Sequence, residues 1–310
     1  MGMTLESNLK RLGRRDWGEL LDLCVEFIPK TTMPVVDPLT VNALPDLQTI
    51  PGNITETEAR STKRDHYFQV GGLHPAMLSE AVVLFYKSLN VVGCTHLELD
   101  NGFKTWGVAS AYHSSYFSAK CLLNILGVNF ARVGDLDLII DILPSYSDQL
   151  RKKEIERRKS TFECRILRSN RLEHWEVWLV LQRILRTLTS SILSSSSLKL
   201  ILNLEPKEFA RQRNRIVYHN TFWLYEDLRD RIVDPDFGCK SIDRERDEAE
   251  ADGLTLLISF LLLNYIHKLL SSLADRVPSF KLEFDPIKVM LESGNFRRYD
   301  SFVKANQFDE

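Results

Sequence analysis

The sequence predicts a mainly α-helical protein whose core is a bundle of four long helices. Apolar side chains recur at helical spacing in long segments between residues 103 and 273, with one small interruption. Each segment has one apolar face, and four such faces are buried most simply when the helices pack as a bundle. The chain has 310 residues, 44% of them hydrophobic, which is enough for one large or two modest domains.

The first part of the chain is expected to be a helical and irregular extension. Residues 5–28 carry apolar side chains roughly at helical spacing and predict an amphipathic helix. Prolines punctuate residues 29–70, which show little periodicity and predict a covering arm or a functional loop. Pro75 suits an early helical position, so a helix is expected over 76–89.

The next two elements are expected to be a helix and a small hairpin. The segment 103–126 mixes small and aromatic residues, which permits close helix packing, and Gly127 is expected to end it. Residues 128–133 and 136–143 are rich in β-branched side chains and flank a Gly-Asp turn signal. They predict a short β-hairpin, with a helix in place of the second strand as the alternative.

Three further helices complete the expected bundle. A broad apolar face predicts a helix over 172–193, and the serine run 194–197 is expected to break it. Pro206 opens a helix that reaches residue 228, and an apolar helix over 254–273 closes the main body. We therefore expect three parts: an N-terminal extension (1–98), a helical domain (99–275) and a C-terminal tail (276–310).

The sequence predicts a cytoplasmic protein. The five cysteines are scattered without a C-x-x-C pair, which favours reduced thiols over disulfides or a zinc site. The N-terminus lacks the apolar core of a signal peptide. Residues 254–267 lack charged side chains, but this stretch of about fourteen residues is shorter than the roughly twenty that a membrane span needs. We expect a buried helix there and no membrane association.

Only one segment of the sequence combines the residue types that chemistry needs. Glycine-rich phosphate loops, nucleophile elbows and metal-ligand spacings are missing from the sequence, so we expect no metal and no cofactor. In RQRNRIVYHN, residues 211–220, helical spacing places Arg211, Arg215 and His219 on one stripe. Arg213 lies about 120° around the helix from His219.

This cationic stripe is suited to a phosphodiester. Arginines hold and neutralise a phosphate, and an imidazole titrates near neutral pH and moves a proton. With RNA the attacking group is the substrate's own 2′-OH, so neither a metal nor an enzyme nucleophile is required. The alternative is a solvated arginine face with a structural histidine.

A second basic segment is a candidate RNA track. Residues 151–171 carry nine Lys and Arg side chains against three Glu, whereas the whole chain has a net charge of −2. Nucleic-acid contact must therefore come from a local patch. The substrate-binding candidates in the two segments are Arg211, Arg215, Tyr218, Lys152, Lys153, Arg157 and Arg158. A solvated surface is the alternative for the basic segment. For His113, in the small-aromatic helix, we expect a packed core position, with an approach to the pocket as the alternative.

The arrangement of these residues resembles the HEPN superfamily. Arg213-Asn214 followed by His219 is similar to the Arg-polar…His signature of that family, on the third of four helices. The earlier helix WGVASAYHSSYFSAKCLLNILG resembles the first HEPN helix, and the resemblance covers roughly residues 100–275. The chain departs from the commonest spacing, because four residues rather than three separate Asn214 from His219. This leaves Arg215 as a substitute for Arg213.

The resemblance implies a metal-independent endoribonuclease that acts as a homodimer, with two copies of the motif in one cleft. Arg213 would stabilise the developing charge, Asn214 would orient the arginine or the scissile group, and His219 would act as general acid or base. Many members are toxins or antiviral effectors, so RNA and a cognate antitoxin or regulatory protein are the implied partners. The alternatives are a non-catalytic HEPN-like module that binds RNA or protein, and a purely structural helical module whose 29–70 segment wraps a partner.

Overall fold

The computed structural model shows a mainly α-helical protein with one small sheet. It describes residues 66–69, 73–133, 136–141, 163–169, 173–188, 195–207 and 250–281, and, more sparsely, 16–18, 21–22, 25, 209–211, 214 and 284–285. The helices are α5 (Leu73–Asp100), α6 (Lys104–Ile125), α8 (His174–Thr187), α9 (Ser195–Asn203) and α11 (Glu250–Arg276). The strands are β1 (His66–Gln69), β2 (Val128–Val133), β3 (Leu136–Asp141) and β4 (Glu163–Ser169).

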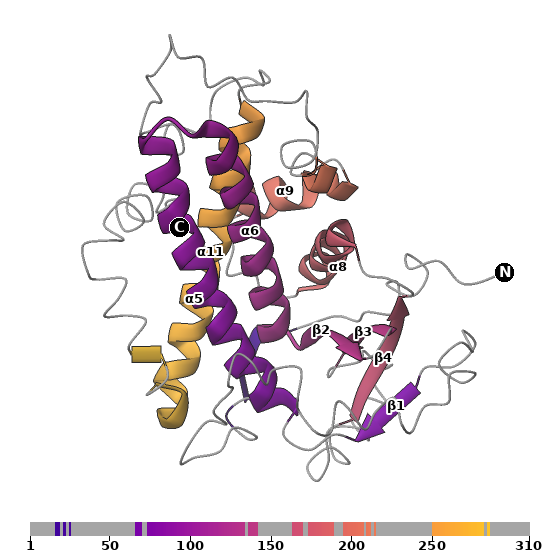
Figure 1. Ribbon diagram of the computed structural model, residues 1–310. Coiled ribbons are helices and arrows are strands. Elements are labelled where there is room, and N and C mark those ends of the chain that lie inside the picture. The colour runs from indigo at the N-terminus through magenta and orange to yellow at the C-terminus, as the bar shows by residue number, and fades with distance from the viewer. Residues whose placement is uncertain are drawn as a thin grey trace, which may run out of the picture.

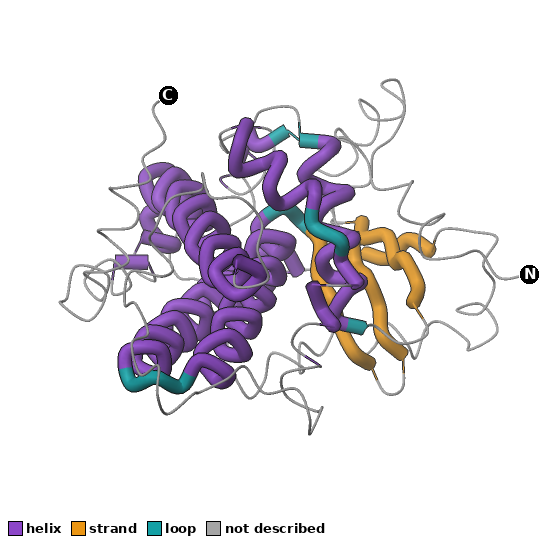
Figure 2. Tube along the Cα trace, turned by 90° about the horizontal axis from the view of Figure 1, so that it is seen from above, coloured by secondary structure: helices purple, strands orange, loops and turns teal. Residues whose placement is uncertain are grey.

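Helix α6 is the centre of the architecture. It packs against α5, α11 and α8, and its C-terminal end meets β2. Figure 1 shows α5, α6 and α11 as long neighbouring helices, with α8 and α9 on one side of them. Seen from above in Figure 2, the strands form a separate group beside the helices. The expectation of a mainly helical protein is therefore confirmed.

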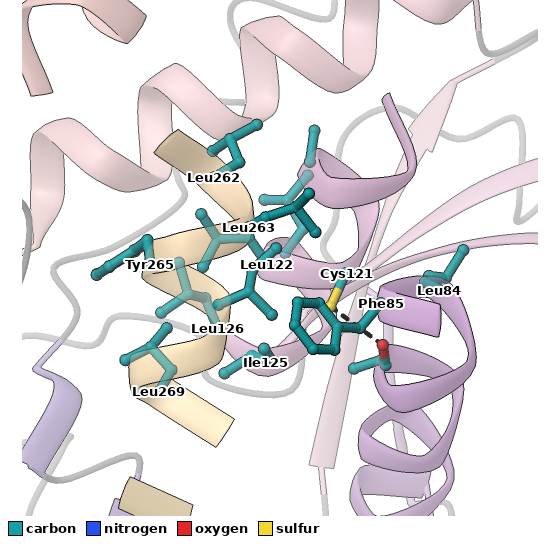
Figure 3. Packing of buried hydrophobic residues seen from close by; sticks show 14 of the residues in the cluster. Leu84, Phe85, Cys121, Leu122, Ile125, Leu126, Leu262, Leu263, Tyr265 and Leu269 are labelled. Atoms are coloured by element: carbon teal, nitrogen blue, oxygen red, sulfur yellow. Dashed lines mark hydrogen bonds between the residues drawn. The ribbon is translucent and has the colours of Figure 1, made fainter. Parts of the chain in front are cut away.

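Side chains from three helices fill the centre of the core. Figure 3 shows Leu122 of α6 and Leu126, immediately after that helix, against Leu263 of α11, with Phe85 of α5 beside them. Phe85 is fully buried, as are the leucines around it. Burial of such side chains from water is the main stabilising contribution to a helical core. Small residues in α6 let its neighbours approach closely, as its composition predicts.

Hydroxyl groups connect the same three helices inside the core. The Ser88 and Ser114 hydroxyls, of α5 and α6, lie 2.8 Å apart, and the Ser114 hydroxyl lies 2.6 Å from that of Ser259 in α11. Ser118 is 2.6 Å from Ser88. All four side chains are buried, and each is hydrogen-bonded, which avoids the cost of a buried unpaired polar group. The network fixes the relative positions of α5, α6 and α11.

Glycines set both ends of α6. Gly102 has φ +83° in the turn that joins α5 to α6. Gly127 has φ +79° immediately after the helix, and its N–H donates to the Asn124 carbonyl at 3.1 Å. A positive φ favours glycine because it carries no Cβ. The expected helix over 103–126 and the role of Gly127 are confirmed.

The expected hairpin is confirmed, but it belongs to a larger sheet. β2 and β3 are antiparallel, with Ala131 opposite Leu138, so the alternative of a helix in place of the second strand is wrong. β3 also pairs with β4, and β4 with β1, which gives the order β1-β4-β3-β2. The segment 29–70 was expected to be irregular and the segment 151–171 was expected to be only a basic run. Each contains a strand, whose pairing partner lies far along the chain and leaves no local signal.

The remaining helices differ from expectation mainly in their ends. α5 continues to Asp100 rather than ending near residue 89. The helix expected over 172–193 ends at Thr187, and the serine run opens α9 instead of only breaking a helix. Serine is common at helix N-termini because its hydroxyl accepts from free backbone N–H groups. The division of the chain into 1–98, 99–275 and 276–310 stays a prediction.

Two core helices are also long and apolar enough to cross a membrane. They are Met77–Asp100 and Thr255–Arg276, with mean hydropathy 1.3 and 1.5. Half of the first window and two-thirds of the second are buried against the rest of the protein. Core helices of soluble proteins pass the same test of length and composition, so these helices are weak evidence for a membrane span.

Candidate functional site

The helix that carries the Arg-Asn motif is anchored to the core through Phe209. We call it the 206–214 helix after its described helical residues, which are 206–207, 209–211 and 214. The Phe209 ring lies 5.4 Å from Tyr112 of α6 and 4.8 Å, edge to face, from Trp178 of α8. Phe209 is 6% exposed and Ala210 is also buried. The helix therefore packs across α6 and α8 by this face.

The opposite face of the 206–214 helix is polar and exposed. Lys207, Arg211 and Asn214 are exposed there. Arg211 follows Lys207 by four positions and precedes Asn214 by three, so the three side chains lie along one stripe. Arg211 and Asn214 also take part in further interactions. This stripe gives the helix a cationic outer surface.

The structure describes two of the predicted site residues, Arg211 and Asn214. Of the three catalytic candidates, Arg213 and His219 lie outside the described residues. Among the substrate-binding candidates, the ones outside are Arg215, Tyr218, Lys152, Lys153, Arg157 and Arg158. That these side chains meet Asn214 in one site stays a prediction.

Residues that sequence reasoning did not single out lie beside this helix. The imidazole of His174, the first residue of α8, stacks on Tyr116 of α6, with centroids 4.3 Å apart and planes 11° from parallel. Tyr112 lies 6.2 Å from the same imidazole, also stacked. Tyr116 and His174 are partly exposed, whereas Tyr112 is buried. The only signal in the sequence was the aromatic-small pattern of α6, because the stack joins two separate helices.

Aromatic contacts continue along α6 from this stack. Tyr116 lies 6.0 Å from Phe117, edge to face, and Phe117 stacks with His113 at 6.4 Å. His113 is partly exposed, so it is not a fully packed core residue.

Two lysines cover rings at the ends of this aromatic group. The Lys87 Nζ of α5 lies 4.2 Å from the Phe117 centroid, and the Lys207 Nζ lies 4.9 Å from that of Trp175 in α8. Both distances allow a cation–π interaction. The Trp175 Nε1–H donates to the Glu173 carboxylate at 2.7 Å, which fixes the orientation of the indole. A lysine therefore flanks the group of rings at each end.

Two other polar features belong to the core. Asn124 and Asn129 donate to one Glu80 carboxylate oxygen at 3.1 and 2.6 Å, which fastens the start of β2 to α5 and α6. Burial, with a smaller contribution from the Glu80 carboxylate, raises the pKa of the Cys121 thiol well above its ordinary value. Its Sγ–H donates to the Ala81 carbonyl at 3.1 Å (Figure 3). Cys121 is therefore a packed, protonated thiol rather than a nucleophile.

Within the described part of the chain, no group of three or more His, Cys, Asp or Glu side chains is arranged to hold a metal ion. Comparison with family models, with curated proteins and with solved structures found no match to this chain.

Proposed function

We propose that the protein is a metal-independent endoribonuclease of the HEPN type. The observation that carries the proposal is the placement of the 206–214 helix. Phe209 anchors it on α6 and α8, while Arg211 and Asn214 lie on its exposed face. A nuclease site requires this combination of a rigid support and an accessible cationic surface. The HEPN-like four-helix arrangement of the domain is part of the same proposal.

The proposed reaction is transfer within the RNA backbone. The 2′-oxygen forms a bond to phosphorus as the bond from phosphorus to the 5′-oxygen breaks. His219 takes the 2′-OH proton or gives one to the departing 5′-oxygen, and the product ends are a 2′,3′-cyclic phosphate and a 5′-OH. Arg213, or Arg215 in its place, stabilises the extra negative charge on the phosphoryl oxygens. Asn214 orients the arginine or the scissile phosphate.

A homodimer completes the proposal. One histidine moves one proton at a time, whereas the reaction needs one proton removed and one supplied. Two copies of the motif in a composite cleft would provide both groups. We further propose a cytoplasmic toxin or antiviral effector, held inactive by an antitoxin or regulatory protein until a signal releases it.

The test is cleavage of a mixed-sequence RNA in the presence of EDTA. Wild-type protein is expected to cleave, and Arg213→Ala and His219→Ala are each expected to lower kcat/KM by a factor of about 10² or more. Lys268→Ala, on the exposed surface of α11, is the matched control and is expected to retain full activity. Cyclic-phosphate ends on the product, detected by mass spectrometry, identify the 2′-OH as the nucleophile.

Two results would overturn the proposal. One is cleavage that EDTA abolishes, because the proposed site needs no metal. The other is wild-type protein that binds RNA without cutting it, which would assign the alternative function of a non-catalytic RNA-binding module.

A further inference from the structure

We propose that single-stranded RNA binds across a surface of aromatic rings, flanked by a lysine at each end, that leads to the 206–214 helix. This aromatic–lysine strip consists of Lys87, Phe117, Tyr116, His174, Trp175 and Lys207. The inference deepens the proposed function, because it names the substrate form and its path. The strip contains no residue of the basic segment 151–171 that the sequence predicts as an RNA track.

Short distances connect the residues of the strip in order. Lys87 covers Phe117 at 4.2 Å, and Phe117 touches Tyr116 at 6.0 Å between centroids. Tyr116 stacks on His174 at 4.3 Å. Trp175 follows His174 in α8 and lies under Lys207 at 4.9 Å. The strip therefore crosses α5, α6 and α8 and ends on the 206–214 helix.

The rings of the strip are partly exposed, whereas other aromatic rings on the same helices are buried. Tyr112 and Trp178 lie on the same helices, α6 and α8, and are 1% and 0% exposed. In contrast, Phe117, Tyr116, His174 and Trp175 are all partly exposed. Phe117, Tyr116 and Trp175 pack against the core with part of their surface and leave the rest accessible as a surface for stacking. Bases stack on such rings whatever their sequence, because every base has a π-face.

The cations of the strip continue into the candidate site. Lys207 and Arg211 are four residues apart on one helix face, and Asn214 is three residues further. A strand whose bases stack on Tyr116 and Trp175 would place its phosphates against Lys207 and Arg211. The exposed carboxylate of Glu173 is in the same area, and it is engaged by the Trp175 indole. The strip therefore guides a strand towards the residues proposed to cut it.

A single strand fits this surface better than a duplex. Bases in a duplex are stacked and paired, so their faces cannot reach protein rings, whereas an unpaired strand exposes them. Among the described residues of the strip and the 206–214 helix, the exposed cations are Lys87, Lys207 and Arg211, which are few for a duplex, whose phosphates are denser.

The experiment measures binding of an RNA that the protein cannot cleave. The probe is a fluorescein-labelled 2′-O-methyl oligouridine of roughly twelve nucleotides, within the size range of single-strand sites. It lacks the 2′-OH nucleophile, so binding is separated from cleavage. Fluorescence anisotropy is expected to show a Kd that rises about tenfold in Tyr116→Leu and in Trp175→Leu. Tyr116→Phe retains the ring and is expected to bind like the wild type.

Salt dependence reports the lysines independently of stacking. Lys87→Met and Lys207→Met keep most of the aliphatic stem and remove the charge. Each is expected to lower the slope of log K against log salt by about 0.7, the value for one phosphate contact with a single strand. Two controls lie outside the strip: Trp106→Leu, whose ring is 52% exposed at the start of α6, and Lys268→Met on α11. Both are expected to leave the Kd and the slope unchanged.

The outcomes separate the strip from the proposed function. Unchanged affinity in folded Tyr116→Leu and Trp175→Leu, wild-type protein that does not bind the probe, or equal affinity for a duplex would each overturn the strip. If cleavage of ordinary RNA nevertheless depends on Arg213 and His219, the proposed function stands without it. If the strip variants weaken binding and no RNA is cut, the strip stands and the proposed function fails.

Discussion

Tyr116 and His174 form a close aromatic stack, with centroids 4.3 Å apart and planes 11° from parallel. One ring belongs to the middle of α6 and the other to the first turn of α8. Both lie next to Tyr112, which also contacts Phe209 of the 206–214 helix. The stack therefore sits where three helices meet and connects the core to the candidate site.

Phe209 is expected to hold the 206–214 helix in place. Phe209→Ala removes the ring between Tyr112 and Trp178, and the resulting cavity is expected to cost about 3–5 kcal/mol of unfolding free energy. Phe209→Leu retains most of the volume and is expected to cost under about 1.5 kcal/mol. Urea denaturation followed by circular dichroism measures both. A loss below about 1 kcal/mol in Phe209→Ala would show that this contact does not anchor the helix.

Two helical glycines are expected to respond in opposite directions to the same substitution. A Cβ at Gly107 would lie 2.6 Å from Cδ2 and 2.8 Å from Cγ of Leu99, so Gly107→Ala is expected to destabilise by about 1–3 kcal/mol. A Cβ at Gly93 meets nothing within 4 Å, so Gly93→Ala is expected to stabilise by about 0.5–1 kcal/mol. Thermal unfolding of the two variants gives the comparison.

The cause of the Gly107 effect has its own control. Leu99→Ala removes the atoms that the new methyl group meets, so in this background Gly107→Ala is expected to cost little. A cost that persists without the Leu99 side chain would assign the effect to the backbone of α6 instead.

Cys121 is expected to make stability fall at alkaline pH. Burial raises its pKa above the ordinary value of 9.0, so the folded protein keeps the proton that the unfolded chain releases. This stability is complete below about pH 9 and is lost as pH rises from there towards the folded pKa. Urea midpoints between about pH 7 and pH 10 measure the decline, and Cys121→Ala is expected to make it shallower. An equal decline in the variant would assign it to other groups.

Much of the helical architecture was predictable because it depends on local pattern. Apolar spacing predicted the helices around residues 103–126 and 254–273, and α6 and α11 are found there. The positive φ of Gly127 and the pairing of β2 with β3 also followed from short segments. Such features depend on residues that are close together in the sequence, so the sequence pattern is enough to predict them.

The pairing of distant segments could not be predicted in the same way. β1 pairs with β4, which is far along the chain, and neither strand carries a distinct local signal. The serines after α8 were read as a break, yet Ser195 begins α9. Serine suits both a break and a helix start, and only packing against α8 distinguishes the two.

The candidate site also has one feature that the sequence predicts and others that depend on contacts between distant segments. By itself, the sequence predicted a stripe of Arg211, Arg215 and His219, because a period of 3.6 residues places them on one face. Arg211 is exposed on the 206–214 helix, and Arg215 and His219 lie outside the described residues. Tertiary structure alone decided that Phe209 anchors this helix to α6 and α8 and that Tyr116 meets His174. Contacts between helices depend on how whole apolar faces fit together, and that free energy is distributed over many distant residues rather than recorded at any one position.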